Sequence, residues 1–154
     1  MKLYLVQHAK AASKEMDPER TLTGQGRRDI QKVAAFIRPL NLSVNRLWHS
    51  GKRRAAQTAE VLAEAIETKE GTTARDGLGP NDNVTALRSE LASTEQDIMI
   101  VGHLPFLSKL TSLLLTGSES ANTVAFKNAG IVCLSRNEEN GWQVDWVLTP
   151  KLLA

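Results

Sequence analysis

The stretch KLYLVQHAK, residues 2–10, begins with an apolar run that stops at His8. Residues 2–7 have the length and composition of a short β-strand that is buried on both faces. A second run of this kind, DIMIVG at residues 97–102, is followed directly by His103. The two runs therefore predict two buried strands, each of which ends at a histidine.

The rest of the chain alternates between helical and strand patterns. Helical periodicity marks four segments, at residues 22–40 (capped by Thr23), 52–67, 83–93 and 104–115. Short strands are predicted at residues 44–50 and 72–75, and an antiparallel hairpin at residues 128–136 and 141–149. Strands that alternate with helices indicate an α/β fold, with a mainly parallel central sheet, helices on both faces and the hairpin at an edge. A length of 154 residues fits a single domain over residues 1–154.

The composition narrows the classes of function. The chain is 42% hydrophobic and 23% charged, and its net charge of +2 comes from interspersed basic and acidic residues, which argues against nucleic acid as the main partner. No apolar run approaches the ~20 residues of a membrane span, so we expect no membrane partner. The single cysteine, Cys133, rules out an internal disulfide and fits a buried structural role. We expect a cytoplasmic protein.

The carboxyl ends of the predicted strands indicate where a ligand binds. In sheets of this kind, ligands bind outside the carboxyl ends of the strands, and both His8 and His103 are predicted at that edge. Arg53 and Arg54 stand at the start of the helix after the strand at residues 44–50. A cation is unfavourable at a helix N-terminus, so a nearby anion would explain the position of Arg54. Arg53 is interpreted as solvated.

Two histidines and an arginine around an anion suggest phosphoryl transfer through a phosphohistidine. Neutral imidazole is a nucleophile near pH 7 without an external base, and an arginine fork matches phosphate oxygens. If protonated, the second histidine stabilises the charge on the transferring group. The chain has no clustered carboxylates and no closely spaced histidine pair for a metal, so we expect neither a metal nor another cofactor.

Four motifs in order, LVQHAKA, TLTGQG, SGKRRAAQTAEVL and IVGHLP, resemble those of the histidine phosphatase superfamily. Within it, the short chain and GHLPFLSKL are most similar to the SixA-type phosphohistidine phosphatases, from residue 2 to about residue 115. This resemblance implies a three-layer α/β/α fold and two-step hydrolysis. It also implies His8 as the nucleophile, Arg54 as a phosphate ligand and His103 as the second catalytic histidine.

The sequence departs from the family pattern at the first motif. Gln7 stands where the family has an arginine, and the loss of a charge-assisted bond costs ~1.5–3 kcal/mol of anion binding. Gln7 remains a candidate phosphate ligand through its amide. Arg20 is the favoured compensating cation, because similar short members carry an arginine there. Lys10 and His49 are weaker candidates: we expect Lys10 to be solvated and His49 to be packed. The family resemblance also implies that the strand ending at His49 lies beside the first strand of the sheet.

The availability of an acid to protonate the leaving group indicates which class of substrate the protein acts on. Asp82 is the candidate general acid, although the NDN cluster around it also suits a helix N-cap, which we favour. A phosphohistidine substrate relaxes the need for an acid because imidazole leaves more readily than an alkoxide. Residues 68–97 are also too few for a folded lid, which favours a protein substrate.

We therefore expect a phosphohistidine phosphatase that acts on a phosphorylated protein, with phosphate as product, in phosphorelay or phosphotransfer signalling. A phosphomonoesterase for small metabolites and a weakly active phosphoryl-binding module remain open as alternatives. The second of these follows from the replacement of the arginine by Gln7.

Overall fold

The computed structural model describes residues 1–154 and consists of a six-stranded sheet, a separate two-stranded pair and helices. The strand order is β5-β3-β6-β1-β7-β8 in the large sheet and β2-β4 in the pair. The strands are β1 (Lys2–Gln7), β2 (Ser43–Val44), β3 (Arg46–His49), β4 (Glu67–Thr68), β5 (Thr72–Ala74), β6 (Ile98–Gly102), β7 (Ile131–Arg136) and β8 (Trp142–Leu148). The helices are α1 (Gly24–Ile37), α2 (Arg53–Ala63), α3 (Thr85–Ala92) and α4 (Phe106–Thr116), with 3₁₀ segments η1 (Arg38–Leu40) and η2 (Pro150–Leu152).

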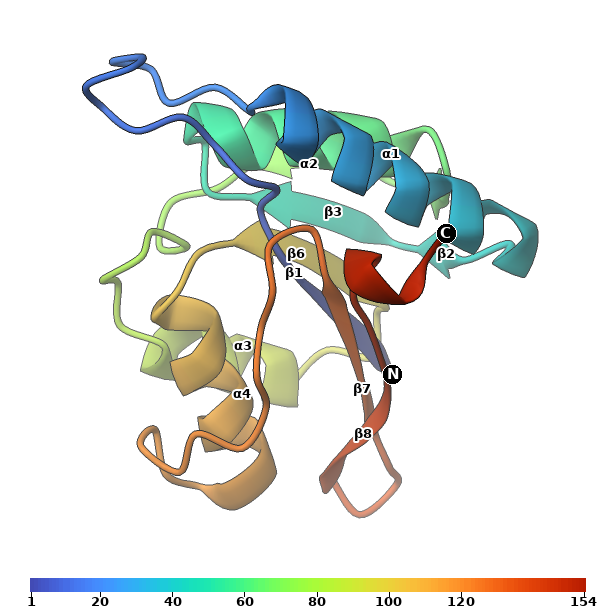
Figure 1. The fold of residues 1–154 in the computed structure, drawn as a ribbon. Helices are drawn as coiled ribbons and strands as arrows, with labels where there is room; N and C mark the ends of the chain where they lie inside the picture. Colours follow the sequence, from blue (N-terminus) through green and yellow to red (C-terminus); the bar gives the residue numbers. More distant parts are fainter.

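Helices cover both faces of the large sheet and complete three layers. In Figure 1, α1 and α2 lie over one face, and α3 and α4 over the other. Successive residues of β1 divide between the two cores, because side chains of a strand alternate between its faces. Tyr4 and Val6 pack in the core beneath α1 and α2, whereas Leu3 and Leu5 pack in the core above α3 and α4. The three-layer α/β/α fold expected from the sequence is confirmed.

The centre of the sheet places the two histidines next to each other. β1 and β6 are parallel neighbours, and Gln7 is the partner of Gly102 in their ladder. The next residue on each strand is a histidine, His8 and His103. On its other side β1 pairs antiparallel with β7, so the C-terminal hairpin closes this edge as expected, with β8 outermost.

The start of α1 is fixed against the loop that follows His8. The Thr23 side chain caps the helix by accepting from the Gly26 N–H at 3.0 Å, as the sequence predicts. The Thr23 N–H donates to the Lys10 carbonyl at 3.0 Å. A Cβ at Gly26 would lie 2.1 Å from that carbonyl oxygen, so this position needs glycine. The LTGQG motif therefore holds α1 against the loop at Lys10.

The structure corrects two expectations from the sequence. The helix predicted over residues 52–67 ends at Ala63, because Glu67 and Thr68 pair with β2 as a strand instead. The strand that ends at His49 does not lie beside β1, because β6 is inserted between β3 and β1. Strand order depends on which faces pack together, and the periodicity of a single segment does not encode it.

Cys133 lies in the middle of β7 and is 1% exposed. Burial raises the pKa of its thiol to about 12, which fits the structural role expected for it. No helix has both the length and the apolar character needed to cross a membrane.

Candidate active site

His8 stands at the carboxyl end of β1 with its ring in a defined tautomer. Its backbone N–H donates to the Gly102 carbonyl at 3.0 Å, which continues the ladder between β1 and β6. Its ring Nδ1 lies 2.7 Å from the carbonyl oxygen of Ala9. Because a carbonyl can only accept, Nδ1 carries the proton and Nε2 keeps its lone pair. The Ala9 N–H in turn donates to the buried Thr58 hydroxyl at 2.9 Å, so α2 fixes the loop that orients the ring.

His103 faces His8 from the end of β6. The two ring centroids are 5.0 Å apart with an interplanar angle of 53°, and His103 is 2% exposed. Its Nε2 lies 2.6 Å from the hydroxyl of Ser50, the residue after β3. We did not predict this contact with Ser50 from the sequence. One feature of the sequence could have indicated it: Ser50 follows a predicted strand directly, at the sheet edge where we expected both histidines.

Arg54 approaches from the first turn of α2. It is half-buried, whereas the neighbouring Arg53 is exposed, in agreement with the different interpretations of the two. The carbonyl of Arg54 accepts from the Thr58 hydroxyl at 2.8 Å. Thr58 therefore connects the backbone of Arg54 with the loop at Ala9.

Buried polar atoms without a hydrogen-bond partner are concentrated at this site. Such atoms are Gln7 Oε1, Arg54 Nε, His103 Nδ1 and Thr111 Oγ1, and the first three belong to residues that the sequence predicts for the site. An unpaired buried polar group costs ~1–3 kcal/mol, so native structures rarely keep one without a reason. Rotation of the Gln7 amide would place a donor at the same buried position. The three groups fit an anionic ligand.

The electrostatics favour neutral histidines in the free site. Burial lowers the pKa of His8, and the charges of Arg54 and Arg20 lower it further. The hydrogen bond to the Ala9 carbonyl raises this pKa but does not outweigh the other effects. Burial and the charges of His8, Arg54, Lys52 and Arg20 lower the pKa of His103 to about 3. His103 is therefore neutral near pH 7 in the free site, whereas the role expected for it required protonation.

Arg20 lies close enough to the two histidines for its charge to act on both rings. Its charge lowers the pKa of both histidines and of Arg54, and its Nε donates to the Ala12 carbonyl at 2.9 Å. The backbone of Arg20 has φ of 51°, a left-handed conformation that is uncommon for a residue with a Cβ. The turn at Asp17 holds it there, since the Arg20 N–H donates to the Asp17 carbonyl at 2.9 Å.

The other cations take different positions. Lys52, which we did not predict, lies close enough to lower the pKa of His103. Lys10 contributes to the pKa shift of neither histidine and lines a separate groove between α1 and η2. His49 accepts from the Gly51 N–H at 3.1 Å, in keeping with a packed rather than a ligand role. The cations whose charge reaches the ring of His103 are therefore Arg20, Lys52 and Arg54.

Asp82 lies near the site without contacting either histidine. Its Oδ2 accepts from the Gly79 N–H at 2.7 Å, and it lines a hollow of about 550 Å³ together with Ser50 and Lys52. Asp82 does not cap α3, contrary to our expectation from the sequence: the N-cap residue is Val84, which makes no side-chain cap, and the first helical N–H, of Thr85, donates to Asn83 Oδ1 at 2.8 Å. No three His, Cys, Asp or Glu side chains gather where they could hold a metal ion.

Comparison with known proteins assigns the chain to a family. Residues 3–78 match the model of the histidine phosphatase superfamily, branch 1. An uncharacterized protein of Picosynechococcus sp. is 30% identical over 141 residues, which cover 87% of this chain and 84% of that protein.

Solved structures show the same fold at low sequence identity. The protein histidine phosphatase SixA in complex with tungstate has a TM-score of 0.86 at 20% identity, over 99% of both chains. A putative SixA from Agrobacterium tumefaciens has a TM-score of 0.77 at 22% identity, over 96% of this chain and 97% of that chain. A phosphoserine phosphatase mutant from Entamoeba histolytica, in complex with phosphoserine, has a TM-score of 0.70 at 14% identity, over 99% of both chains. On these matches, the chain belongs to the histidine phosphatase superfamily and has the fold of its SixA-type members.

Proposed function

We propose that this protein is a phosphohistidine phosphatase that acts on a phosphorylated protein through a covalent phospho-His8 intermediate. Membership of the superfamily supports phosphatase activity. The observation that carries the proposal is the arrangement of His8, which keeps a lone pair on Nε2, beside the unpaired buried polar atoms of Arg54 and His103. These groups supply a nucleophile and two potential donors for the oxygens of one phosphoryl group.

In the first step, His8 Nε2 attacks the phosphorus of a phosphohistidine whose other ring nitrogen is protonated. The bond from phosphorus to Nε2 forms, and the bond to the substrate nitrogen breaks. The electron pair stays on the substrate imidazole, which leaves as a neutral ring. His8 now carries the phosphoryl group on Nε2 and the original proton on Nδ1, where the Ala9 carbonyl accepts from it. The exchange is between two chemically similar imidazoles.

In the second step, water attacks the phosphorus of phospho-His8. The bond from phosphorus to Nε2 breaks, its electrons return to Nε2, and both hydrogens of the water leave with the product as dihydrogen phosphate. Arg54, Arg20 and Lys52 offset the negative charge in both steps. The bound dianion raises the pKa of His103, so that its Nδ1 gains a proton and donates to a phosphoryl oxygen.

The surroundings of the leaving group favour a phosphohistidine substrate. An alkoxide leaving group needs a proton from a positioned acid. The Asp82 carboxylate, the candidate for this role, accepts a hydrogen bond from the Gly79 N–H and contacts neither histidine. No carboxylate contributes to the pKa shift of His8 or His103. A protonated phosphoimidazole brings its own proton. The fold likeness to SixA supports the same substrate class.

A small-molecule phosphomonoesterase is the second candidate. It is favoured by the hollow that Asp82 lines together with Ser50, because Ser50 contacts His103 and the hollow therefore holds a carboxylate near the site. The fold likeness to a phosphoserine phosphatase fits the same alternative. The phosphoryl-binding module is a third candidate, since Gln7 supplies no charge.

Comparison of substrates tests the proposal. We expect kcat/KM for a phosphohistidine protein or peptide to exceed that for phosphoserine and p-nitrophenyl phosphate by at least about 100-fold. Equal or greater activity on the esters would favour the phosphomonoesterase. Tungstate binding without turnover of any of these substrates would favour the binding module.

A further inference from the structure

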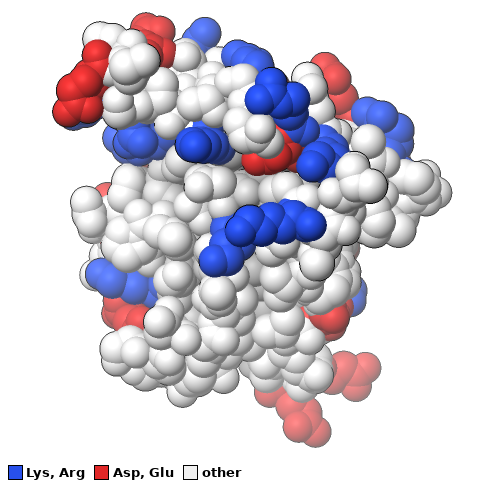
Figure 2. Space-filling view, viewed as in Figure 1, with Lys and Arg blue, Asp and Glu red and all other residues white.

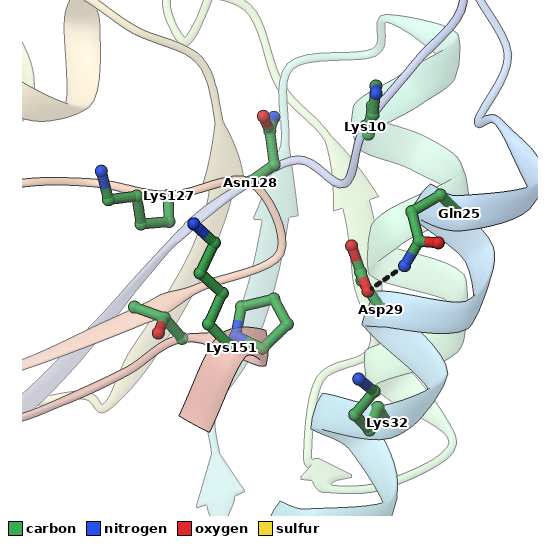
Figure 3. Close-up of a pocket in the computed structure, with 9 residues that line it drawn as sticks. Lys10, Gln25, Asp29, Lys32, Lys127, Asn128 and Lys151 are labelled. Atoms are coloured by element: carbon green, nitrogen blue, oxygen red, sulfur yellow. Dashed lines mark hydrogen bonds between the residues drawn. The ribbon is translucent and has the colours of Figure 1, made fainter. Parts of the chain in front are cut away.

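A groove lined almost entirely by polar and charged side chains lies beside the candidate active site. Its volume is about 470 Å³, and none of its lining residues is hydrophobic. Four lysines contribute to it from separate segments: Lys10 after β1, Lys32 on α1, Lys127 before β7 and Lys151 on η2. We refer to this feature as the lysine groove. Figure 3 shows Lys127 and Lys151 on one side and Lys10 and Lys32 on the side of α1.

The positive charge of the lysine groove is not neutralised within the chain. The ion pairs of the protein involve Lys2, Arg46, Arg75 and Arg136, and none involves a lysine of the groove. Asp29 is the one carboxylate in the lining, and it accepts from the Gln25 amide at 2.7 Å. Figure 2 shows basic side chains gathered along this hollowed face. Four lysines against one aspartate leave an excess of positive charge that a negatively charged partner would offset.

The lysine groove is continuous with the loops that build the active site. Lys10 is two residues from His8, so their Cα atoms lie within about 7 Å. Asn128, also in the lining, donates from its side-chain amide to the His8 carbonyl at 2.9 Å, and the Ala129 N–H donates to the Gln7 carbonyl at 2.9 Å. The lysine groove therefore lies within reach of residues that flank a phosphorylated side chain at His8.

The lining chemistry favours carboxylates as the ligand. The lining contains no aromatic ring on which a nucleobase could stack, and no arginine fork for bidentate contact with one phosphate. Lysines are compact charges on flexible stems, spread over both walls, and they suit several carboxylates in variable positions. Such complementarity raises the association rate and selects partners.

We propose that the lysine groove docks an acidic segment of the phosphorylated protein substrate and so directs its phosphohistidine to His8. This inference rests on the proposed function of the active site and adds a specificity element to it. The predicted substrate carries Asp and Glu residues a few positions from the phosphohistidine, or beside it on the folded surface.

Two chemically phosphorylated histidine peptides test the docking. One carries a run of Asp and Glu near the phosphohistidine, and the other carries Gly and Ser at the same positions. At low salt, we expect the native protein to show kcat/KM at least about tenfold higher for the acidic peptide. This ratio should fall to near one in about 0.5 M salt.

A charge-reversal variant locates the effect. In Lys32→Glu/Lys127→Glu/Lys151→Glu, the ratio between the two peptides should fall to one or below, while the neutral peptide reports the state of the catalytic site. The matched control is Lys69→Glu/Arg88→Glu/Lys109→Glu, which makes the same charge change at exposed positions outside the groove. It should keep the preference. Equal kcat/KM for both peptides in the native protein, or an unchanged preference in the groove variant, would overturn the proposal.

Binding of the unphosphorylated acidic peptide separates this inference from the proposed function. Fluorescence anisotropy should show weaker binding to the groove variant than to the control variant, even if neither peptide is turned over. Absence of turnover with intact, groove-dependent peptide binding would contradict the phosphatase and leave the docking standing. A single-stranded oligonucleotide that binds more tightly than the peptide through the same lysines would assign the groove to nucleic acid and overturn the proposal.

Discussion

The rings of His8 and His103 face each other, with centroids 5.0 Å apart, because the residues before them are partners in one parallel ladder. Gln7 pairs with Gly102 at the ends of β1 and β6, so both histidines leave the sheet at the same edge. The strands hold the two histidines at this edge by backbone hydrogen bonds, the first turn of α2 carries Arg54, and neighbouring loops carry Arg20 and Lys52. The roles of the cations and of the polar residues can be separated by substitution.

Replacement of Arg54 should strongly impair the reaction. We expect Arg54→Ala to lower kcat/KM for a phosphohistidine peptide by about 100-fold or more, because it removes a preorganised charged donor. Arg53→Ala is the matched control, since Arg53 is exposed on the same helical turn. Steady-state kinetics should show near-native activity for this control. Equal losses of kcat/KM in the two variants would mean that activity depends on the total charge at the start of α2 and not on a specific contact of Arg54.

Removal of the Ser50 hydroxyl should impair His103. In Ser50→Ala, the His103 Nε2 loses its partner at 2.6 Å, and we expect kcat/KM to fall about tenfold, equivalent to about 1.4 kcal/mol. The control is Ser89→Ala, because Ser89 bonds only within its own helix, to the Thr85 carbonyl. Native kinetics in Ser50→Ala would show that the contact with His103 is not used.

Restoring an arginine at position 7 should tighten anion binding. Gln7→Arg adds a cation next to His8 in the chain and should lower the Kd for vanadate or phosphate. Arg20→Ala should weaken binding more than Lys10→Ala, because Arg20 acts on both histidines and Lys10 lines the lysine groove. Titration calorimetry distinguishes these variants. A lower affinity in Gln7→Arg would show that the pocket is shaped for the amide.

The lowered pKa of His103 should make the fold sensitive to acid. The unfolded chain takes up a proton near the ordinary pKa of 6.5, whereas folded His103 does so only near about 3. Between these values the unfolded state binds more protons, so the free energy of unfolding should fall as the pH falls. Urea unfolding at pH 7 and pH 5 should show a smaller loss for His103→Asn than for the native chain. Identical losses would contradict the burial of a neutral His103.

Most of the fold can be read from the sequence because its buried strands are continuous apolar runs. The runs that end at His8 and His103 also predict the edge at which the site forms. Strand order was partly wrong, since the insertion of β6 between β3 and β1 depends on long-range packing. Ser50 and Lys52 were missed because their importance depends on how the loop after β3 folds toward His103. Only the folded chain brings together the lysines of the groove, which lie far apart in sequence.

Detection of the phosphorylated intermediate tests the central claim most directly. The native protein is mixed with a radiolabelled phosphohistidine peptide, quenched rapidly in base and separated from the substrate. We predict a base-stable, acid-labile phosphate that maps to the fragment containing His8, and no such label in His8→Ala. Arg53→Ala is the control and should be labelled like the native chain. Acid-labile phosphate retained by His8→Ala, or turnover by that variant, would place the nucleophile elsewhere and contradict the account.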